Sequence, residues 1–174
     1  DGGVGYLIFN NPERHNAVSL EMWEAARAIL DDFEKDNEVR VVVLTGAGQK
    51  AFVSGADISK FGDERATQEG IAKYNAATDR AFTGVHDFPK PTIAMIRGFC
   101  LGGGMALAVC CDLRVCTPGS KFGIPAAKLG LGVLCFSAAS PAQLAPLIEI
   151  YKENIGDAEP VGDYVNDNIA VVSQ

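Results

Sequence analysis

Two glycine-containing turns are suited to chemistry through their backbone amides. Gly102-Gly103-Gly104 follows a strand-like run and opens an apolar helix, and a second turn is centred on Gly55. Glycine lets a backbone approach a ligand closely, and the amides at the start of a helix carry its positive dipole end. Two such donors aimed at one point form an oxyanion hole, which stabilises a developing negative charge on oxygen. The alternatives are close helix packing at the triple glycine and a turn capped by Asp57 in the second segment.

Neither turn matches a phosphate-binding loop. The G-x-G-x-x-G dinucleotide pattern fails because Leu107 occupies the third glycine position. The segment Gly46 to Lys50 lacks the spacing of a Walker A loop and has no Ser or Thr after the lysine. A nucleotide site of either kind is therefore not predicted.

Five short motifs resemble the crotonase family, also called the enoyl-CoA hydratase/isomerase superfamily. Their order and spacing make the resemblance specific, and they cover residues 1–132, about three quarters of the chain. The motifs are Asn16-Ala17-Val18, Phe52 to Ile58, Pro91 to Ala94 with Arg97-Gly98, Gly102 to Gly104 leading to Cys111-Asp112, and Phe122 to Pro125 with Leu129-Gly130.

The resemblance implies an α/β fold, a crotonase-like spiral of ββα units, and an acyl-CoA thioester as the ligand. It implies that the amides of Ala56 and Gly103 bind the thioester oxygen as an enolate forms. Coenzyme A would be part of the substrate, with no separate cofactor and no metal. The full-length protein would form a homotrimer or hexamer. The residues expected to contact the ligand are Arg14, Ser54, Ala56, Asp57, Ile58, Gly102 and Gly103, with Arg14 near a CoA phosphate.

The chain departs from the family at both acid/base positions. Family hydratases carry glutamates at the positions of Ala106 and Ala126, and alanine cannot transfer protons. The possible substitutes are Lys128, Asp79, His86, Cys110 and Cys111, each of which is more simply interpreted as structural or solvated. Asp112 matches a family aspartate and is predicted to be a buried hydrogen-bonding residue.

Three functions remain open from these residues. The leading prediction is an enoyl-CoA hydratase/isomerase-type enzyme that stabilises a thioester enolate. The alternative is a catalytically silent acyl-CoA-binding or assembly subunit, which Ala106 and Ala126 favour. A cysteine or serine hydrolase is the weakest, since Cys110, Cys111 and Ser54 have no visible His partner and G-x-S-x-G is absent.

Strands alternate with helices before residue 117, as in an α/β domain. Ser19 is the predicted N-cap of the first helix, and Phe88-Pro89 ends the second. The third helix is apolar on every face and is expected to be buried. The predicted strands are Val4–Phe9, Val39–Thr45, Thr92–Ile96 and Asp112–Cys116, and the predicted helices begin at Leu20, near Ala66 and at Met105, the last two ending near Asp87 and at Cys111.

The last part of the chain differs from the rest. Residues 133–174 match no family motif, so the chain is divided into a crotonase-like acyl-CoA-binding core, 1–132, and a divergent C-terminal segment, 133–174. Within that segment the pattern predicts a helix over Pro141–Asn154 and a strand near Ile169–Val172.

Composition limits the partners and the compartment. The chain has 174 residues, 48% of them hydrophobic, and 15 Lys and Arg against 22 Asp and Glu give a net charge of −7, which disfavours nucleic acid. Its five cysteines, including Cys100, Cys116 and Cys135, form no C-x-x-C pair, which favours free thiols in the cytoplasm or an organelle matrix. No signal peptide is recognised, and glycines and prolines in the charge-free stretch Leu129–Ile148 argue against a membrane helix.

Overall fold

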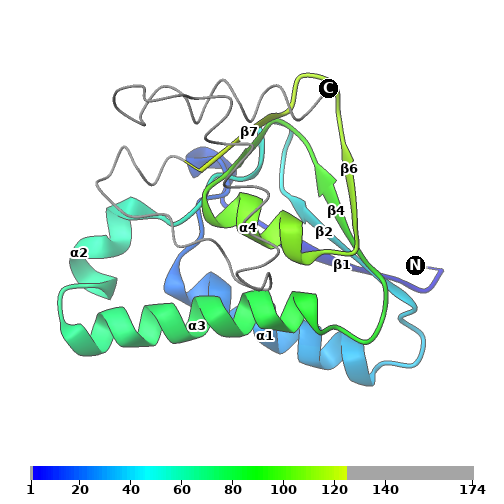
Figure 1. Ribbon diagram of the computed structural model, residues 1–174, viewed down its shortest axis with the longest axis horizontal. Coiled ribbons are helices and arrows are strands. Elements are labelled where there is room, and N and C mark those ends of the chain that lie inside the picture. The colour runs from blue at the N-terminus through cyan, green and yellow to red at the C-terminus, as the bar shows by residue number, and fades with distance from the viewer. Residues whose placement is uncertain (1, 125–174) are drawn as a thin grey trace, which may run out of the picture. The chain divides into compact units, whose positions relative to one another are not determined.

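The computed structural model describes residues 2–124, which form two sheets and the helices that follow their strands (Figure 1). The larger sheet has the order β1-β2-β4-β6 and its neighbouring strands are parallel. The smaller sheet has the order β3-β5-β7. The strands are β1 Val4–Phe9, β2 Val41–Gly46, β3 Ala51–Val53, β4 Thr92–Ile96, β5 Phe99–Leu101, β6 Leu113–Cys116 and β7 Lys121–Gly123.

The strands and helices repeat as ββα units. Each unit gives one strand to the larger sheet, one to the smaller sheet and then a helix. Two units, β2-β3-α3 and β4-β5-α4, have this order. In the unit that begins with β1, a parallel bridge between Val18 and Ala56 takes the place of the second strand, and α1 follows. The helices are α1 Leu20–Lys35, α2 Phe61–Glu64, α3 Gln68–His86 and α4 Gly103–Cys110, with 3-10 turns η1 Pro12–Arg14 and η2 Ile58–Lys60. The predicted α/β spiral of ββα units is confirmed.

The first helix forms as its sequence pattern predicts. The Ser19 side chain caps α1 by accepting a hydrogen bond from the Met22 N–H. Trp23, Ala26 and Leu30 follow at helical spacing and are buried. The other end is held by Lys90, whose Nζ donates to two carbonyl oxygens in the last turn. The helix therefore has a fixed start, a buried stripe and a fixed end.

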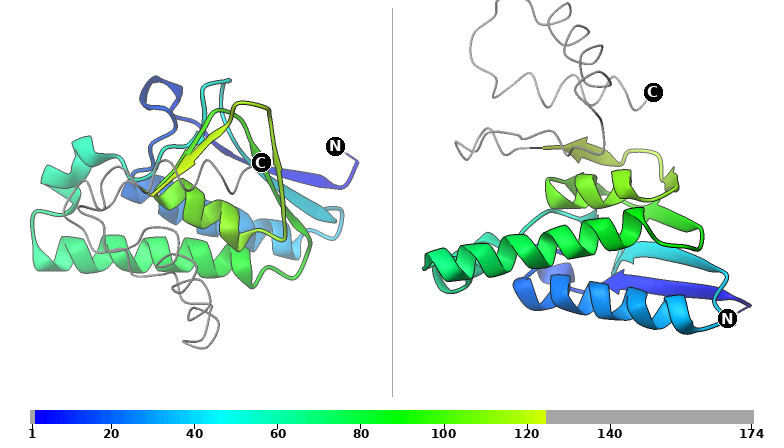
Figure 2. Two further views of the ribbon diagram at one scale, coloured as in Figure 1. Left: turned by 45° about the horizontal axis from the view of Figure 1, so that its top comes forward. Right: turned by 60° about the horizontal axis from the view of Figure 1, so that its bottom comes forward.

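The long helix α3 lies beside α1, as both views in Figure 2 show. The Thr67 side chain caps it by accepting from the Gly70 N–H at 3.0 Å. Its buried residues, Tyr74, Ala77, Ala81 and Val85, form the stripe that faces the core. The Trp23 ring lies between Phe9 and Phe82, with ring centroids 6.0 Å and 5.3 Å away, so α1, α3 and β1 share one core.

Several predicted boundaries and burials are wrong. β2 begins at Val41 rather than Val39, because the amides of Arg40 and Val41 donate to the Gly3 carbonyl in a turn before the strand. α4 begins at Gly103 rather than Met105, so two of the three glycines are helical. It is apolar on every face, as predicted, but it is not buried on every face, since Val109 is 58% exposed. Strand β6, by contrast, was predicted within one residue of its start, Leu113.

Some predictions fall on residues outside the described range. These are the helix over 141–154, the strand at 169–172, the boundary at residue 132, the charge-free stretch 129–148, and Cys135. Within residues 2–124, no helix is long and apolar enough to cross a membrane. No group of three or more His, Cys, Asp or Glu in that range could hold a metal ion.

Candidate functional site

The two glycine turns meet in space. Gly55 has φ +103° and Gly102 has φ +53°, conformations that side chains rarely adopt. A Cβ built on Gly55 would lie 3.3 Å from the Leu101 carbonyl oxygen and 3.6 Å from the Gly103 N. Segments almost fifty residues apart in sequence are thus in direct backbone contact, and glycine at position 55 permits that contact.

Val18, which forms an isolated parallel bridge with Ala56, fixes the backbone around that residue. Its N–H donates to the Gly55 carbonyl at 2.8 Å, and its carbonyl accepts from the Asp57 N–H at 2.9 Å. The Ala56 N–H lies between these two bonds and has no acceptor within residues 2–124. The Gly103 N–H, at the first position of α4, also has none in that range. Two unpaired amides therefore lie on adjacent backbone segments.

Helix α4 is held against the smaller sheet without an intervening side chain. A Cβ on Gly104 would lie 2.1 Å from the Val53 carbonyl oxygen, so only glycine allows this approach. At Gly103 the nearest neighbour is the Trp23 ring, 3.5 Å from a Cβ built there. The close packing expected as an alternative for the triple glycine is thus present at Gly104, one residue beyond the unpaired amide.

The acid/base position on α4 holds no proton carrier. Ala106 is buried at 4% exposure, three residues after Gly103. The second position, Ala126, lies outside the described residues, as does Lys128. The only substitutes in the described range are thus Asp79, His86, Cys110 and Cys111.

The described substitutes do not form an acid/base site. Asp79 and His86 are exposed on α3. Tyr74 is the residue of that helix that bonds to Val18, and His86 lies roughly 18 Å further along the helix, at 1.5 Å per residue. Burial raises the pKa of Cys111 to about 12 and also raises the pKa of Cys110. Thiols of this kind remain protonated near neutral pH, which argues against a cysteine nucleophile.

Asp112 forms the hydrogen bonds expected of a structural residue. Its Oδ2 accepts from the Thr92 N–H at 2.7 Å and from the Thr92 hydroxyl at 2.8 Å. These bonds hold the pKa of Asp112 below its usual value. The expectation that Asp112 is buried is wrong, because it precedes the exposed edge strand β6 and is itself exposed.

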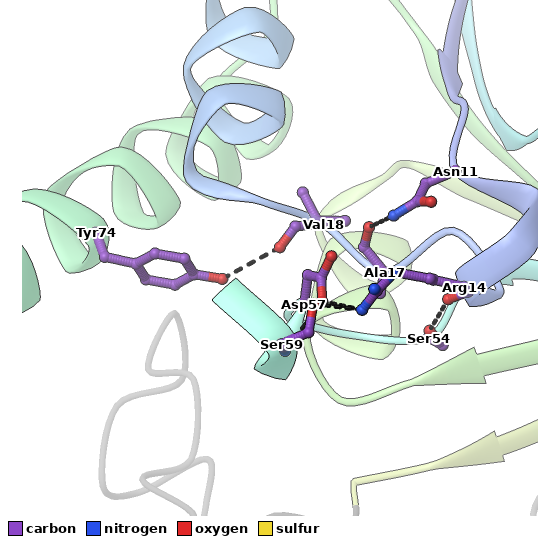
Figure 3. A network of polar contacts seen from close by, with 8 residues as sticks. All are labelled: Asn11, Arg14, Ala17, Val18, Ser54, Asp57, Ser59 and Tyr74. Carbon is purple, nitrogen blue, oxygen red and sulfur yellow. Dashed lines mark hydrogen bonds and ion pairs between the residues drawn. The ribbon is translucent and has the colours of Figure 1, made fainter. Parts of the chain in front are cut away.

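An ion pair and a serine form a polar cluster beside Ala56 (Figure 3). Arg14 Nη1 lies 3.4 Å from Asp57 Oδ1 and donates to the Ser59 hydroxyl. The Ser59 hydroxyl in turn donates to Asp57 Oδ1 at 2.6 Å. This hydrogen bond lowers the pKa of Asp57; burial opposes it, while the Ser59 N–H and Arg14 reinforce it. Asp57 also caps η2, as predicted.

Most of the predicted ligand-contacting residues gather at one open pocket. It has a volume of about 480 Å³ and is lined by Arg14, Ala17, Ser54, Ala56, Asp57, Ile58 and Ser59. Five of these were predicted as binding residues from the sequence. Gly102 and Gly103 approach the same segment through Gly55. The structure therefore brings the residues predicted to contact the ligand together around residues 54–58, five at the pocket and the two glycines through Gly55.

The loop that carries Arg14 is held by one buried amide. Asn16 is fully buried, and its Nδ2 donates to the carbonyls of Ala47 and Ala51 at 2.9 Å and 2.8 Å. Its Oδ1 accepts from the Asn11 N–H at 3.0 Å. Asn16 and its neighbour His15 both have positive φ, near +55°. This bracing fixes the turn from which Arg14 reaches Asp57.

Sequence reasoning did not place Trp23 and Tyr74 at this site. Trp23 Nε1 donates to the Tyr74 hydroxyl at 3.1 Å, and that hydroxyl donates to the Val18 carbonyl at 3.5 Å (Figure 3). Burial raises the pKa of Tyr74. Helical spacing had indicated that both side chains are buried, but no local signal pairs residues 51 positions apart. Their hydrogen bonds hold Val18, which is bridged to Ala56.

Comparison with known proteins agrees with this fold. The family model described as enoyl-CoA hydratase/isomerase matches residues 1–143. A short-chain-enoyl-CoA hydratase from Clostridium acetobutylicum is 38% identical over 133 residues, 76% of this chain and 49% of that protein. A mouse mitochondrial Δ(3,5)-Δ(2,4)-dienoyl-CoA isomerase is 35% identical over 141 residues, 74% of this chain and 42% of that protein.

A solved structure extends the agreement. An enoyl-CoA hydratase/carnithine racemase from Magnetospirillum magneticum has a TM-score of 0.74 at 32% identity, covering 99% of this chain and 70% of that one. The fold and the glycine-turn site thus define a crotonase-fold protein. The chain belongs to the enoyl-CoA hydratase/isomerase family. It spans about half the length of the curated relatives that it matches.

Proposed function

We propose that this chain is the acyl-CoA-binding part of an enzyme of the enoyl-CoA hydratase/isomerase type. The amides of Ala56 and Gly103 would bind the thioester oxygen and stabilise it as an enolate forms. The observation that carries this proposal is the contact between the two glycine turns, with both amides lacking an acceptor within residues 2–124. Coenzyme A enters as part of the substrate, so no separate cofactor is required.

The geometry supports charge stabilisation at the thioester oxygen. Removing a proton next to the thioester, or adding a nucleophile to a conjugated double bond, moves negative charge onto that oxygen. Two fixed N–H donors meet this charge without having to reorganise. The Gly103 donor also opens α4, so the positive end of the helix dipole adds to it. One such donor is worth about 2.7–4 kcal/mol of transition-state stabilisation.

Arg14 is the candidate for a CoA phosphate contact. Its side chain is 55% exposed, and its contacts with Asp57 and Ser59 both use Nη1, so its guanidinium can also reach an anion in the open pocket. A local cation of this kind is needed because the chain as a whole carries a net charge of −7. Ser54 and Ile58 also line this pocket.

A catalytically silent acyl-CoA-binding or assembly subunit is the second candidate. Buried Ala106 favours it, because a methyl group replaces one of the two family carboxylates. The two candidates share the ligand and differ in turnover. Assembly of the full-length protein into a trimer or hexamer, and its location in the cytoplasm or an organelle matrix, remain predictions.

The proposal is tested with a chromophoric thioester such as 4-dimethylaminocinnamoyl-CoA and the full chain. Hydrogen bonds to the carbonyl oxygen polarise the conjugated system, so bound thioester is expected to absorb at longer wavelength. Gly103→Pro removes the amide proton at the first helical position, where proline is tolerated. We expect the spectral shift to shrink in this variant, while CoA binding weakens much less.

Gly103→Ala is the matched control, because it keeps the amide and adds a Cβ in ordinary contact with Trp23. It should retain the spectral shift. Circular dichroism and melting establish that both variants fold. An unchanged shift in folded Gly103→Pro, or no binding of any acyl-CoA to the wild-type chain, would overturn the proposal.

A further inference from the structure

Arg65 lies between two aromatic rings. Its guanidinium carbon is 4.4 Å from the centre of the Phe61 ring and 4.0 Å from the centre of the Tyr74 ring. Both distances are within the range of cation–π contacts. Arg65 ends α2, and its N–H donates to the Phe61 carbonyl at 3.0 Å, which fixes the backbone from which the side chain projects.

The charge of Arg65 has no counter-ion in the described part of the chain. No carboxylate of residues 2–124 forms an ion pair with it, and its buried Nε has no hydrogen-bond acceptor there. The neighbouring Glu64 forms no ion pair with Arg65 in that range: its Oε1 accepts from the Leu20 N–H at 3.1 Å, and its buried Oε2 has no hydrogen-bond partner there. Arg27, by comparison, is paired with Asp31. Aromatic faces hold a guanidinium in place without neutralising it.

Direct contacts connect Arg65 with the thioester-oxygen site. The Tyr74 ring touches Arg65, its hydroxyl accepts from Trp23, and the Trp23 ring lies against Gly103. In Figure 3 Tyr74 and Arg14 lie on opposite sides of Asp57. A ligand whose phosphates contact Arg14 and whose carbonyl contacts Gly103 would therefore direct its acyl end toward the side of the site on which Arg65 lies.

We infer that Arg65 binds a carboxylate on the acyl group, so that the preferred substrates are thioesters of dicarboxylic acids. The inference rests on the proposed function, because it uses the same thioester-oxygen site. A guanidinium offers a planar set of donors that matches a carboxylate and is less strongly hydrated than an ammonium group. Phe61 and Tyr74 hold that plane before the ligand arrives, which reduces the entropy lost on binding.

The test compares two acyl-CoAs of equal shape by calorimetric titration of the full chain. Glutaryl-CoA carries a terminal carboxylate, and 5-methylhexanoyl-CoA carries two methyl groups in place of its oxygens. We expect glutaryl-CoA to bind about tenfold or more tightly than its neutral isostere, as a hydrogen bond to a charged group provides. Arg65→Met should abolish that preference and leave the affinity for 5-methylhexanoyl-CoA nearly unchanged.

Arg80→Met is the matched control. Arg80 is exposed on α3 and its replacement removes the same charge, so the preference should persist. Arg65→Lys should keep part of it. If Arg65 only braces the corner between α2 and α3, Arg65→Met lowers the melting temperature and leaves the ratio of the two affinities intact, which overturns the inference.

The outcomes separate this inference from the proposed function. Equal binding of both thioesters to the wild-type chain, together with the spectral shift of the chromophoric thioester, refutes the carboxylate preference and leaves the proposed function standing. Failure of both thioesters to bind, with the chromophoric thioester still bound, refutes this inference alone, whereas failure of all three to bind refutes the proposed function as well.

Discussion

Ala106 places a methyl group three residues after Gly103, on the buried side of α4. A hydration reaction needs a group that activates water and one that returns a proton, and each contributes about 10²–10⁴-fold. Stabilising the thioester oxygen lowers the barrier without supplying either. Hydration thus needs both charge stabilisation and proton transfer. In residues 2–124 the candidate site has groups for charge stabilisation, and Ala106 cannot transfer a proton.

We therefore expect very slow hydration of crotonyl-CoA by this chain, even when the thioester is bound. The decrease in ultraviolet absorbance of the conjugated thioester measures the rate. A turnover number of roughly 1 s⁻¹ or more, within the ordinary enzyme range, would contradict the expectation. It would show that a side chain interpreted as structural carries the proton.

Asp57 links stability to pH. Its carboxylate is 6% exposed and accepts hydrogen bonds from the Ser59 hydroxyl and N–H, which depress its pKa in the folded state. Because the pKa of Asp57 is lower in the folded than in the unfolded state, its charge stabilises the fold at pH values above the unfolded pKa, which is near 3.9. This stabilisation is lost as the pH falls through the folded pKa. Asp57→Asn should lower the free energy of unfolding by about 1.5–3 kcal/mol at pH 7.

The difference between wild type and Asp57→Asn should shrink as the pH falls below about 4. Urea unfolding at several pH values measures it. Asp63→Asn, which removes an exposed carboxylate from α2, is the control and should change little at any pH. A constant difference across the range would mean that the charge of Asp57 adds nothing to stability.

At the scale of elements, the contact of α4 with β3 is set by Gly104. A Cβ there would lie 2.1 Å from a backbone oxygen of Val53, whereas a Cβ on Gly103 would be in ordinary contact with a side chain. We expect Gly104→Ala to reduce the free energy of unfolding by about 3 kcal/mol, the upper part of the range for overpacking, or more. Backbone must move, because neither partner is a flexible side chain.

Gly103→Ala provides the comparison within the same turn and should unfold within about 1 kcal/mol of wild type, since alanine is also the better helix former. Denaturant titration of both variants measures the difference. Equal stability of the two variants would be inconsistent with direct packing of α4 on β3.

The long elements could be predicted from sequence because each carries its own pattern. Ser19 and the stripe from Trp23 to Leu30 predict α1, and the β-branched run predicts β2 within two residues. The three-residue strands β3, β5 and β7 are too short for a period, and only pairing with distant strands makes them strands. None of the three is among the strands that the sequence pattern predicts.

The candidate site could be predicted where it depends on local motifs. The turns at Gly55 and Gly103 and the cap at Asp57 are visible as residue types in sequence. The hydrogen bond from Trp23 to Tyr74 and the stacking of Arg65 depend on how α1 packs against α3. Such long-range contacts follow from tertiary packing, which no single segment encodes.

At the scale of the whole molecule, the reactivity of the cysteines shows whether the core is closed. Burial raises the pKa of Cys100 and of Cys111 to about 12, whereas Cys116 is exposed on the edge strand β6. A thiol-specific reagent at pH 8 should modify Cys116 rapidly. Cys100 and Cys111 should react only when the core opens, because their thiols are both inaccessible and protonated.

Mass spectrometry of digested, labelled protein assigns the reaction to each cysteine. Adding urea should speed the labelling of Cys100 and Cys111 and leave Cys116 nearly unchanged. Rapid labelling of Cys100 in the native protein would show that the smaller sheet opens independently of the rest.

The strands of the larger sheet follow one another across the sheet in the order in which they occur along the chain, β1-β2-β4-β6. During translation the N-terminus leaves the ribosome first, at about 5–20 residues per second. When each new strand of this sheet leaves the ribosome, the strand that it pairs with has already been synthesised. No strand has to be inserted between two others. The sheet can therefore grow at a single edge while synthesis continues, so a nascent chain that stalls after a helix already has every completed strand of this sheet paired with the one before it.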